Sequence, residues 1–370
     1  MKLEEFGGTY GDFYVPSFIA KVGDQDLVRE LFLTVTRVEV GMKQKAPADF
    51  SLTIASAFDW AKRDFVAMRD EEEIDLIELF AFGAPVEIMM GYGNASPLTS
   101  MLKGIVTRVG TGFSESGTPE LTIGGFDKLH PLTIGKETHH WEKVRDSDVV
   151  RDIASKNNLD ADVSRTDPER PRVDQNEQSD FGFLKTLAER NQGVTFYVRG
   201  DQLHFAPSRK KETAKVQLHW GGGLSSFSPT ANIARQITAV EVCGTSAETG
   251  KAFVGRAERG DESDSENSRE SGSGRIAKAL GRSPVMRIRA AVRNEDEAKA
   301  RARAILEERG QDLVTGDGEC VGLPDIVPDM NVEILQVGRA FSKSYYVTEA
   351  THTIDSSGYR TRFQVEEMLV

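Results

Sequence analysis

The stretch Pro85-Val86-Glu87-Ile88-Met89-Met90-Gly91 opens a pattern that returns near the end of the chain. It is followed by a second strand-like segment, a Ser116-Gly117 turn and a returning strand. Val332-Glu333-Ile334 is followed by the same series, with its turn at Ser357-Gly358. Apolar residues at every second position predict half-buried strands in both places. The two ends of the chain are therefore expected to fold in a similar way.

The spacing within the two series is also shared. Gly104 lies 13 residues before Gly117, and Tyr345 lies 13 residues before Gly358. Hairpins with Ser-Gly turns are common, so the echo is either a coincidence or the trace of a duplication. A duplication would give two similar β-barrels. A trimer of such a chain would present six similar units in a ring.

The first third of the chain is predicted to consist mainly of strands. Phe50, Leu52 and Ile54 alternate with polar residues, which is the period of a half-buried strand. In the preceding segment the apolar set changes register, which indicates either a β-bulge near Arg37 or two different environments along one long strand. The acidic start of the segment 71–80 suits a helix N-terminus, and a short helix is expected there.

The middle of the chain alternates helices and strands. Val149, Val150 and Ile153 lie on one face of a helix expected over 147–156. Ser179 is a candidate cap for a second helix. Two short strands follow, over 194–199 and 202–206. A compact α/β module is therefore expected here.

The last third returns to strands, interrupted by one helix that Asn294 can cap. Between positions 244 and 283 lies a segment rich in Ser, Gly, Glu and Arg, and 258–274 contains no large apolar residue. Such a segment cannot offset its ordering entropy by burial, so a mobile loop is expected. Strands are expected over 233–242, 285–291, 312–321, 331–337, 344–354 and 359–365.

These patterns predict an α+β fold, mostly antiparallel β, in which two tube-protein-like β-barrels flank a small α/β module. The first barrel domain is expected over residues 1–128 and the α/β module over 129–212. The second barrel domain is expected over 213–370, with its polar insert at about 244–283. A chain of 370 residues has room for two or three domains.

The composition argues against several classes of protein. The formal net charge of -12 argues against a general nucleic-acid binder, which needs Lys and Arg to displace counterions from phosphates. Two cysteines, Cys243 and Cys320, do not make a disulfide framework and fit a reducing compartment. We expect no signal peptide in the first ten residues, which contain acidic residues and no apolar core, and no apolar run approaches the length of a membrane span. We therefore expect no membrane insertion.

Candidate chemical sites are weak. His139-His140-Trp141-Glu142 is the densest group of potential metal ligands, but adjacent residues of a strand point to opposite sides. Gly221-Gly222-Gly223 lacks the Lys and the helix that a phosphate loop needs, so a turn is expected. The tripeptide Arg259-Gly260-Asp261 matches an adhesion motif. It lies in a segment rich in Ser, Glu and Arg, where we expect such a match to arise by chance. We expect no catalytic, cofactor-binding or metal-binding residues, and no cofactor.

One basic stretch follows the acidic part of the polar segment. Arg275, Lys278 and Arg282 could neutralise that segment or contact an acidic partner, and the sequence leaves both readings open. The remaining histidines are scattered, and each is expected to be a core or surface residue without a ligand.

The order of these features resembles the phage late-control D family, the hub proteins of contractile tail baseplates. It is also similar to the hub part of type VI secretion VgrG spike proteins. The resemblance runs from Pro16-Ser17-Phe18 to Phe363, and its most diagnostic part is the middle, with Ser147-Asp148-Val149-Val150 and Gln178-Ser179-Asp180-Phe181. These are packing and turn residues, so the resemblance rests on their order.

The resemblance implies a structural protein without enzymatic activity. It implies a homotrimeric baseplate hub that joins the central spike to the inner tube, or to a tube-initiator protein, and adapts three-fold to six-fold symmetry. Other baseplate proteins are further expected partners, and nucleic acid is not. The protein would be assembled in the cytoplasm, then reside in the baseplate of a phage tail or of an extracellular or cytoplasmic contractile injection particle.

This sequence differs from the family's pattern in two places. The sequence ends after the second barrel, where the secretion-system relatives continue into a needle, so a separate spike protein is expected. The polar segment at 244–283 is the other departure. Two alternatives remain: a tail-associated peptidoglycan hydrolase that uses two carboxylates, and a monomeric partner-binding module.

Overall fold

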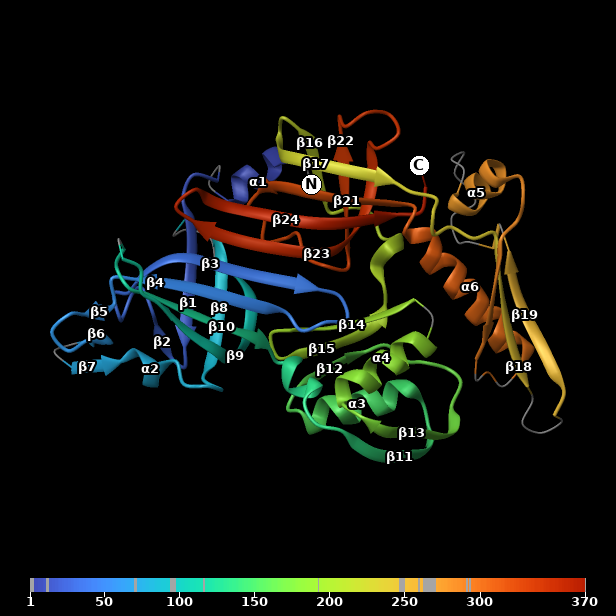
Figure 1. Cartoon of the computed structure of the whole chain (residues 1–370), viewed down its shortest axis with the longest axis horizontal. Coiled ribbons are helices and arrows are strands. Elements are labelled where there is room, and N and C mark those ends of the chain that lie inside the picture. Colours follow the sequence, from blue (N-terminus) through green and yellow to red (C-terminus); the bar gives the residue numbers. More distant parts are fainter. Residues whose placement is uncertain are drawn as a thin grey trace.

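The computed structural model describes residues 3–10, 13–69, 72–93, 98–115, 117–191, 193–245, 250–258, 260–261, 271–290, 292 and 294–369. Strands dominate, and one sheet of thirteen strands runs through the molecule (Figure 1). Within the described residues, smaller sheets and six α-helices surround it. The prediction of a mostly antiparallel α+β fold is confirmed.

Six strands of the C-terminal part close into a barrel. Each pairs with two neighbours in the order β16-β22-β23-β24-β21-β17, and β17 returns to β16 through the rungs His219–Gly223 and Trp220–Leu224. The barrel core contains Leu218, Val332 and Tyr345. The strands are β16 (Val216–Trp220), β17 (Gly223–Ala231), β21 (Val314–Val321), β22 (Met330–Leu335), β23 (Lys343–Asp355) and β24 (Gly358–Glu367).

Six strands of the N-terminal part follow the same order along the chain and across the sheet. Their spatial order is β1-β8-β9-β10-β4-β3, which matches the second unit strand for strand, although β1 is antiparallel to β8 where β16 is parallel to β22. The strands are β1 (Pro16–Val22), β3 (Thr34–Lys43), β4 (Asp49–Ala55), β8 (Pro85–Tyr92), β9 (Thr99–Gly112) and β10 (Glu120–Asp127).

This first unit is not closed in the way that the sequence predicted. Among the described strands, β1 and β3 do not pair. The segment between them fills the gap: Leu27 donates its backbone N–H to Ala20 of β1, and Leu33 donates to Leu27. Leu27, Leu31 and Leu33 are buried there. A leucine-rich connection therefore completes the first core where the second has a strand pair.

Two β-bulges fall at equivalent positions in the two units. In β9 the pairing with β10 skips Thr107, three residues after Gly104, and in β23 the pairing with β24 skips Thr348, three residues after Tyr345. The predicted bulge near Arg37 is confirmed, since the pairing of β3 with β4 skips the third residue of β3.

The third residue of β17 is likewise skipped in its pairing with β21. Bulges are specific features of a fold, so four bulges in two matching pairs support a duplication. The rungs Val86–Gly104 and Val332–Tyr345 agree with this equivalence.

The two units share one sheet because β3 pairs with β23. Six antiparallel rungs, from Val38–Ile354 to Lys43–Glu349, join them, and Figure 1 shows β3 and β4 beside β23 and β24. We call this pairing the seam. Val38, Val40 and His352 are fully buried at it. The two units are therefore continuous, with the α/β module packed beneath them.

The α/β module has its own core, which includes Leu129, Val149, Phe183 and Phe205. Ser179 caps α4, as predicted, by accepting a hydrogen bond from the Gly182 N–H at 3.1 Å. The module contains β11 (Glu137–Val144), α3 (Asp146–Lys156), β12 (Asp160–Val163), β13 (Arg170–Gln178), α4 (Asp180–Arg190), β14 (Val194–Arg199) and β15 (Gln202–Pro207).

A small lobe is inserted between β17 and β21, and it corrects the expectation of a structureless insert. Its sheet has the order β19-β18-β20, and α6 packs on it through Ala298, Ala302 and Leu306. Residues 259 and 262–270, where the mobile loop was expected, lie outside the described residues. The elements are β18 (Ala239–Thr245), β19 (Ala252–Glu258), α5 (Gly272–Leu280), β20 (Val285–Arg289) and α6 (Glu295–Gln311).

The helix expected over 71–80 is mostly wrong. Residues 72–75 form a strand that pairs with β6, and only the four residues of α2 are helical, capped by the Asp75 carboxylate. Sheet pairing outweighs the local helix signal there. The remaining elements are α1 (Leu3–Tyr10), β2 (Gln25–Asp26), β5 (Phe58–Asp59), β6 (Asp64–Arg69), β7 (Glu72–Asp75), α2 (Leu76–Leu79) and two 3-10 turns (His130–Thr133 and Arg209–Lys211).

We predict that Gly125→Ala disrupts the first unit. A Cβ at Gly125 would lie 2.0 Å from the Ile105 carbonyl oxygen and 2.7 Å from a ring carbon of Phe50. Forced overpacking of this kind costs about 1–3 kcal/mol or more, so thermal unfolding should show a lower Tm or the soluble protein should be lost. Gly112→Ala in the paired strand is the control, because a Cβ there meets nothing within 4 Å. Equal stability of the two variants would contradict this packing.

We predict that His352 makes the fold sensitive to mild acid. Burial lowers the pKa of His352 to about 4 from its ordinary 6.5. The unfolded chain therefore binds a proton between pH 6.5 and 4 that the folded chain excludes, so stability falls as pH falls through this window. The loss approaches about 3 kcal/mol at pH 4. Urea unfolding of the wild type and of His352→Gln, followed across this range, should show a shallower pH dependence in the variant. The same slope in both proteins would refute the assignment.

Candidate assembly surfaces

The histidine cluster lies on an exposed strand of the module. His139 and His140 belong to β11, and both side chains are exposed. Trp141 faces the core, where it stacks on Phe183 and donates its indole N–H to Asp152 at 3.0 Å. In the part of the chain that the structure describes, no group of three or more His, Cys, Asp or Glu side chains is placed to hold a metal ion.

The glycine run, the two cysteines and Asp261 all lie in strands or in the turns next to them. Gly221 and Gly223 have positive φ values of 82° and 87°, and they form the turn between β16 and β17 that the sequence predicted. Both cysteines are unpaired thiols on strands, and burial raises the pKa of Cys320. Asp261 caps the end of β19 by accepting the Glu258 N–H, and Arg259 lies outside the described residues.

His204 and His352 have partners that sequence reasoning could not assign. His204 bonds through Nδ1 to Asp162 at 2.7 Å and stacks on Tyr197. His352 Nε2 donates to the Ile326 carbonyl oxygen at 2.9 Å, and Nδ1 then accepts from the Tyr359 hydroxyl. Both histidines are therefore buried parts of the fold. His352 lies at the seam, where it pairs with Val40.

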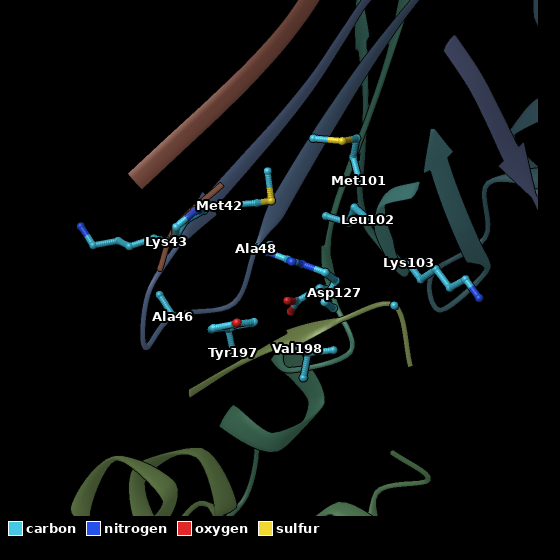
Figure 2. A pocket seen from close by; sticks show the side chains of 13 residues that line it. Met42, Lys43, Ala46, Ala48, Met101, Leu102, Lys103, Asp127, Tyr197 and Val198 are labelled. Carbon is cyan, nitrogen blue, oxygen red and sulfur yellow. The ribbon is translucent and has the colours of Figure 1, made fainter. Parts of the chain in front are cut away.

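A small cavity lies where the first unit meets the module. Asp127 points into it among Met42, Ala48, Leu102 and Tyr197, and Lys43 and Lys103 point away from it (Figure 2). Burial raises the pKa of Asp127 to about 7, against hydrogen bonds from the backbone N–H groups of nearby residues. The cavity volume of about 30 Å³ has room for water and is too small for a sugar ring or a peptide.

Polar contacts fix the module against both units near this cavity. The Asp201 carboxylate binds Lys103 at 2.8 Å and also Lys128, both from the first unit. Gln44, in the loop after β3, donates to the Tyr346 hydroxyl of the second unit at 2.7 Å. Tyr346 donates in turn to the buried Asp329, which also accepts a hydrogen bond from the Tyr197 hydroxyl of the module at 3.5 Å. These bonds place the module under the seam.

One face of the continuous sheet is polar. Ser226, Asp317, Glu319, Glu349 and Arg362 line a groove of about 310 Å³ on this face, across β17, β21, β24 and β23. On the same face Arg362 binds Glu319 at 2.6 Å, and Lys43 binds Glu349 across the seam. The groove is open, and Glu319 and Glu349 each bind a cation, which suits a solvated surface better than a binding pocket.

Exposed aromatic residues gather at the far end of β9. Phe113 is 64% exposed and Trp60 is 69% exposed. Both rings pack edge-to-face on Phe58, and Phe113 also contacts Phe65. An exposed apolar group of this kind is typical of a surface that contacts another protein. The sequence did not single it out, because its members come from separate segments.

In the part of the chain that the structure describes, no helix is both long and apolar enough to cross a membrane.

Solved structures share this fold over nearly the whole chain. The 43 kDa tail protein of prophage MuSo2 from Shewanella oneidensis has a TM-score of 0.69 at 14% identity, covering 95% of this chain and 98% of that one. The tail protein from Neisseria meningitidis MC58 has a TM-score of 0.67 at 12% identity, covering 96% and 97%. These identities establish the fold alone.

A secretion-system protein is also similar. The Escherichia coli c3393 protein, described as a component of the type VI secretion system with structural similarity to the T4 bacteriophage tail proteins gp27 and gp5, has a TM-score of 0.56 at 11% identity. The likeness covers 94% of this chain and 76% of that chain. The expected tail-protein fold is thus confirmed.

Comparison of the sequence with curated proteins finds no match. A family model described as the Alg8 N-terminal domain matches residues 56–356. The matched region begins just after β4 and ends in the turn between β23 and β24, so it includes the module, the inserted lobe and most of the second unit. Because the match spans well over half of the 370 residues, the chain belongs to the family of the Alg8 N-terminal domain.

Proposed function

We propose that this protein is the structural hub of the baseplate in a contractile tail or injection machine, with the role of the late-control D proteins. Three copies would form a ring that holds a spike protein on one face and starts the inner tube on the other. The observation that carries the proposal is the duplicated six-strand unit, continuous across the seam, in a chain with the fold of phage tail proteins.

The duplication gives a physical reason for this role. A three-fold ring of chains with two equivalent units each presents six similar surfaces. A six-fold tube can then meet a three-fold spike without a separate interface for each tube subunit. The matched bulges of β9 with β23, and of β3 with β17, support true equivalence of the two units.

The described surfaces favour assembly over catalysis. The cavity at Asp127 is too small for a substrate, and two carboxylates of the larger groove, Glu319 and Glu349, are bound to Arg362 and Lys43. A glycoside hydrolase would need two carboxylates across a cleft that admits a sugar chain. A zymogram in which the purified protein lyses peptidoglycan would therefore contradict the proposal.

We predict a ring-shaped trimer with a central opening. Light scattering should give three times the mass of one chain, and electron microscopy of the same sample should show the ring. The measurement is made on the protein alone and on the protein co-expressed with candidate spike proteins. A chain that stays monomeric with its spike partner present would rule out the hub.

A further inference from the structure

We propose that the open edge of β20, in the inserted lobe, binds an extended segment of a partner protein in which acidic and apolar residues alternate. The site goes beyond the proposed hub function, which assigns no role to the lobe. Its evidence is an edge strand with one strand neighbour among the described residues, two half-buried apolar side chains on one face of that strand, and two exposed arginines on the other face.

β20 is the last strand of a three-stranded sheet. The order is β19-β18-β20, and in the described part of the chain β20 pairs only with β18, in parallel. Ala290 donates its backbone N–H to the Cys243 carbonyl oxygen, so the even-numbered residues of this segment turn their backbone groups toward β18. The N–H and C=O groups of Val285, Arg287 and Arg289 therefore point to the open side, where an added strand would bind them.

One face of β20 is only partly covered by the lobe. Met286 and Ile288 pair with Val240 and Val242 of β18, so all four side chains lie on the same face of the sheet. The two valines are fully buried, whereas Met286 and Ile288 are half-buried. The reason is that α6 packs on this face mainly against β18 and β19, beside which it lies in Figure 1. Apolar side chains of an added strand would cover the two residues of β20.

The opposite face of β20 is basic. Arg287 and Arg289 are exposed there, and the side chain of Arg287 is 76% exposed. Arg287 binds Glu241 of β18 at 2.6 Å, but Glu241 also binds Arg256 of β19 at 2.8 Å and so does not serve Arg287 alone. Arg289 lies on the next rung, opposite Cys243, and no carboxylate of the described residues binds it. This face therefore retains positive charge for a ligand.

The charge of the surrounding segment determines the chemistry of the partner. Residues 271–290 contain no Asp or Glu, in a chain whose formal net charge is -12, and their basic residues are Arg275, Lys278, Arg282, Arg287 and Arg289. Lys278 and Arg282 are exposed, in α5 and in the turn before β20. Arginines on an edge strand repel a cationic segment and give a neutral one no ion pair. An acidic segment is therefore the partner that this edge selects.

A strand of alternating acidic and apolar residues satisfies both faces at once. Its acidic side chains would lie beside Arg287 and Arg289, and its apolar side chains would cover Met286 and Ile288, because successive side chains of a strand point to opposite faces. Hydrogen bonds to the backbone of the edge supply affinity, and the alternating side chains supply specificity. β19, the other edge strand of this sheet, is less suited because α6 already packs on it.

Fluorescence anisotropy of the full chain with synthetic peptides tests this site. The probe is a short fluorescein-labelled peptide in which glutamate and valine alternate, and the matched probe has lysine in place of each glutamate. The protein should bind the acidic peptide and not the basic one, and added salt should weaken the binding because exposed ion pairs are screened. Absence of saturable binding of the acidic peptide, or equal binding of both peptides, overturns the proposal.

A charge reversal locates the peptide on β20. Arg289→Glu replaces an attraction by a repulsion, so the acidic peptide should bind about fivefold more weakly or worse, and the basic peptide should gain affinity. Arg303→Glu is the matched control, since Arg303 is an exposed arginine of the same lobe on α6, at the other face of the sheet. Circular dichroism of both variants checks the fold. An equal loss in the control shows unspecific charge attraction and overturns the site.

A proline tests the backbone contact without a change of charge. The N–H of Val285 faces the open side, so Val285→Pro keeps the ladder to β18 and removes one donor from the edge. The acidic peptide should bind this variant more weakly. Unchanged affinity would rule out strand addition at β20.

The chain's own acidic residues are the alternative occupant of this edge. Glu262, Asp264 and Glu266 alternate with serines in the sequence. The triple variant Glu262→Gln, Asp264→Asn, Glu266→Gln should bind the acidic peptide with the affinity of the wild type if the edge is open to a partner. Binding of the peptide to the triple variant alone would mean that the chain fills its own edge, and the proposal would then be wrong.

Discussion

The pairing of β3 with β23 is the interaction on which the rest of this structure depends. Its six rungs cover the edge of β3 and the part of β23 that β22 leaves unpaired. With the seam formed, Val38, Val40 and His352 are removed from water, and the leucine-lined first core and the barrel core lie on the same side of one sheet. The opposite side is left as a continuous polar face, where Lys43 and Glu349 bind each other across the junction.

The module is positioned by the same junction. Gln44 lies in the loop after β3, at the end of the seam, and donates to the Tyr346 hydroxyl. Tyr346 donates to Asp329, and Asp329 also accepts a hydrogen bond from Tyr197 of the module. The carboxylate of Asp201 ties the turn between β14 and β15 to two lysines of the first unit. The small cavity at Asp127 lies beside these contacts, between the first unit and the module.

The two units differ most in the length of one connection between strands, where a change costs little free energy. The connection after β3 spans only residues 44–48, whereas the equivalent connection after β17 spans 232–313 and carries the inserted lobe. The free-energy cost of closing a longer loop grows slowly with its length, and this lobe contributes its own core under α6. The strand order and the bulges are retained, because a shift of one residue would turn the apolar side chains out of the core.

The sequence by itself determined the strands with clear alternation, the module helices, the Ser179 and Asn294 caps, the register change near Arg37 and the repeated pattern of the two ends, because each of these depends on residues near each other in the chain. It also showed that no motif for catalysis or metal binding stands out. Only the tertiary structure decided that β3 pairs with β23, that the polar segment contains a lobe, and that β20 lies at the edge of the lobe's sheet. Those features depend on backbone groups of residues about 300 positions apart in the seam, and a backbone N–H has the same chemistry in every strand, so side-chain patterns do not specify its partner.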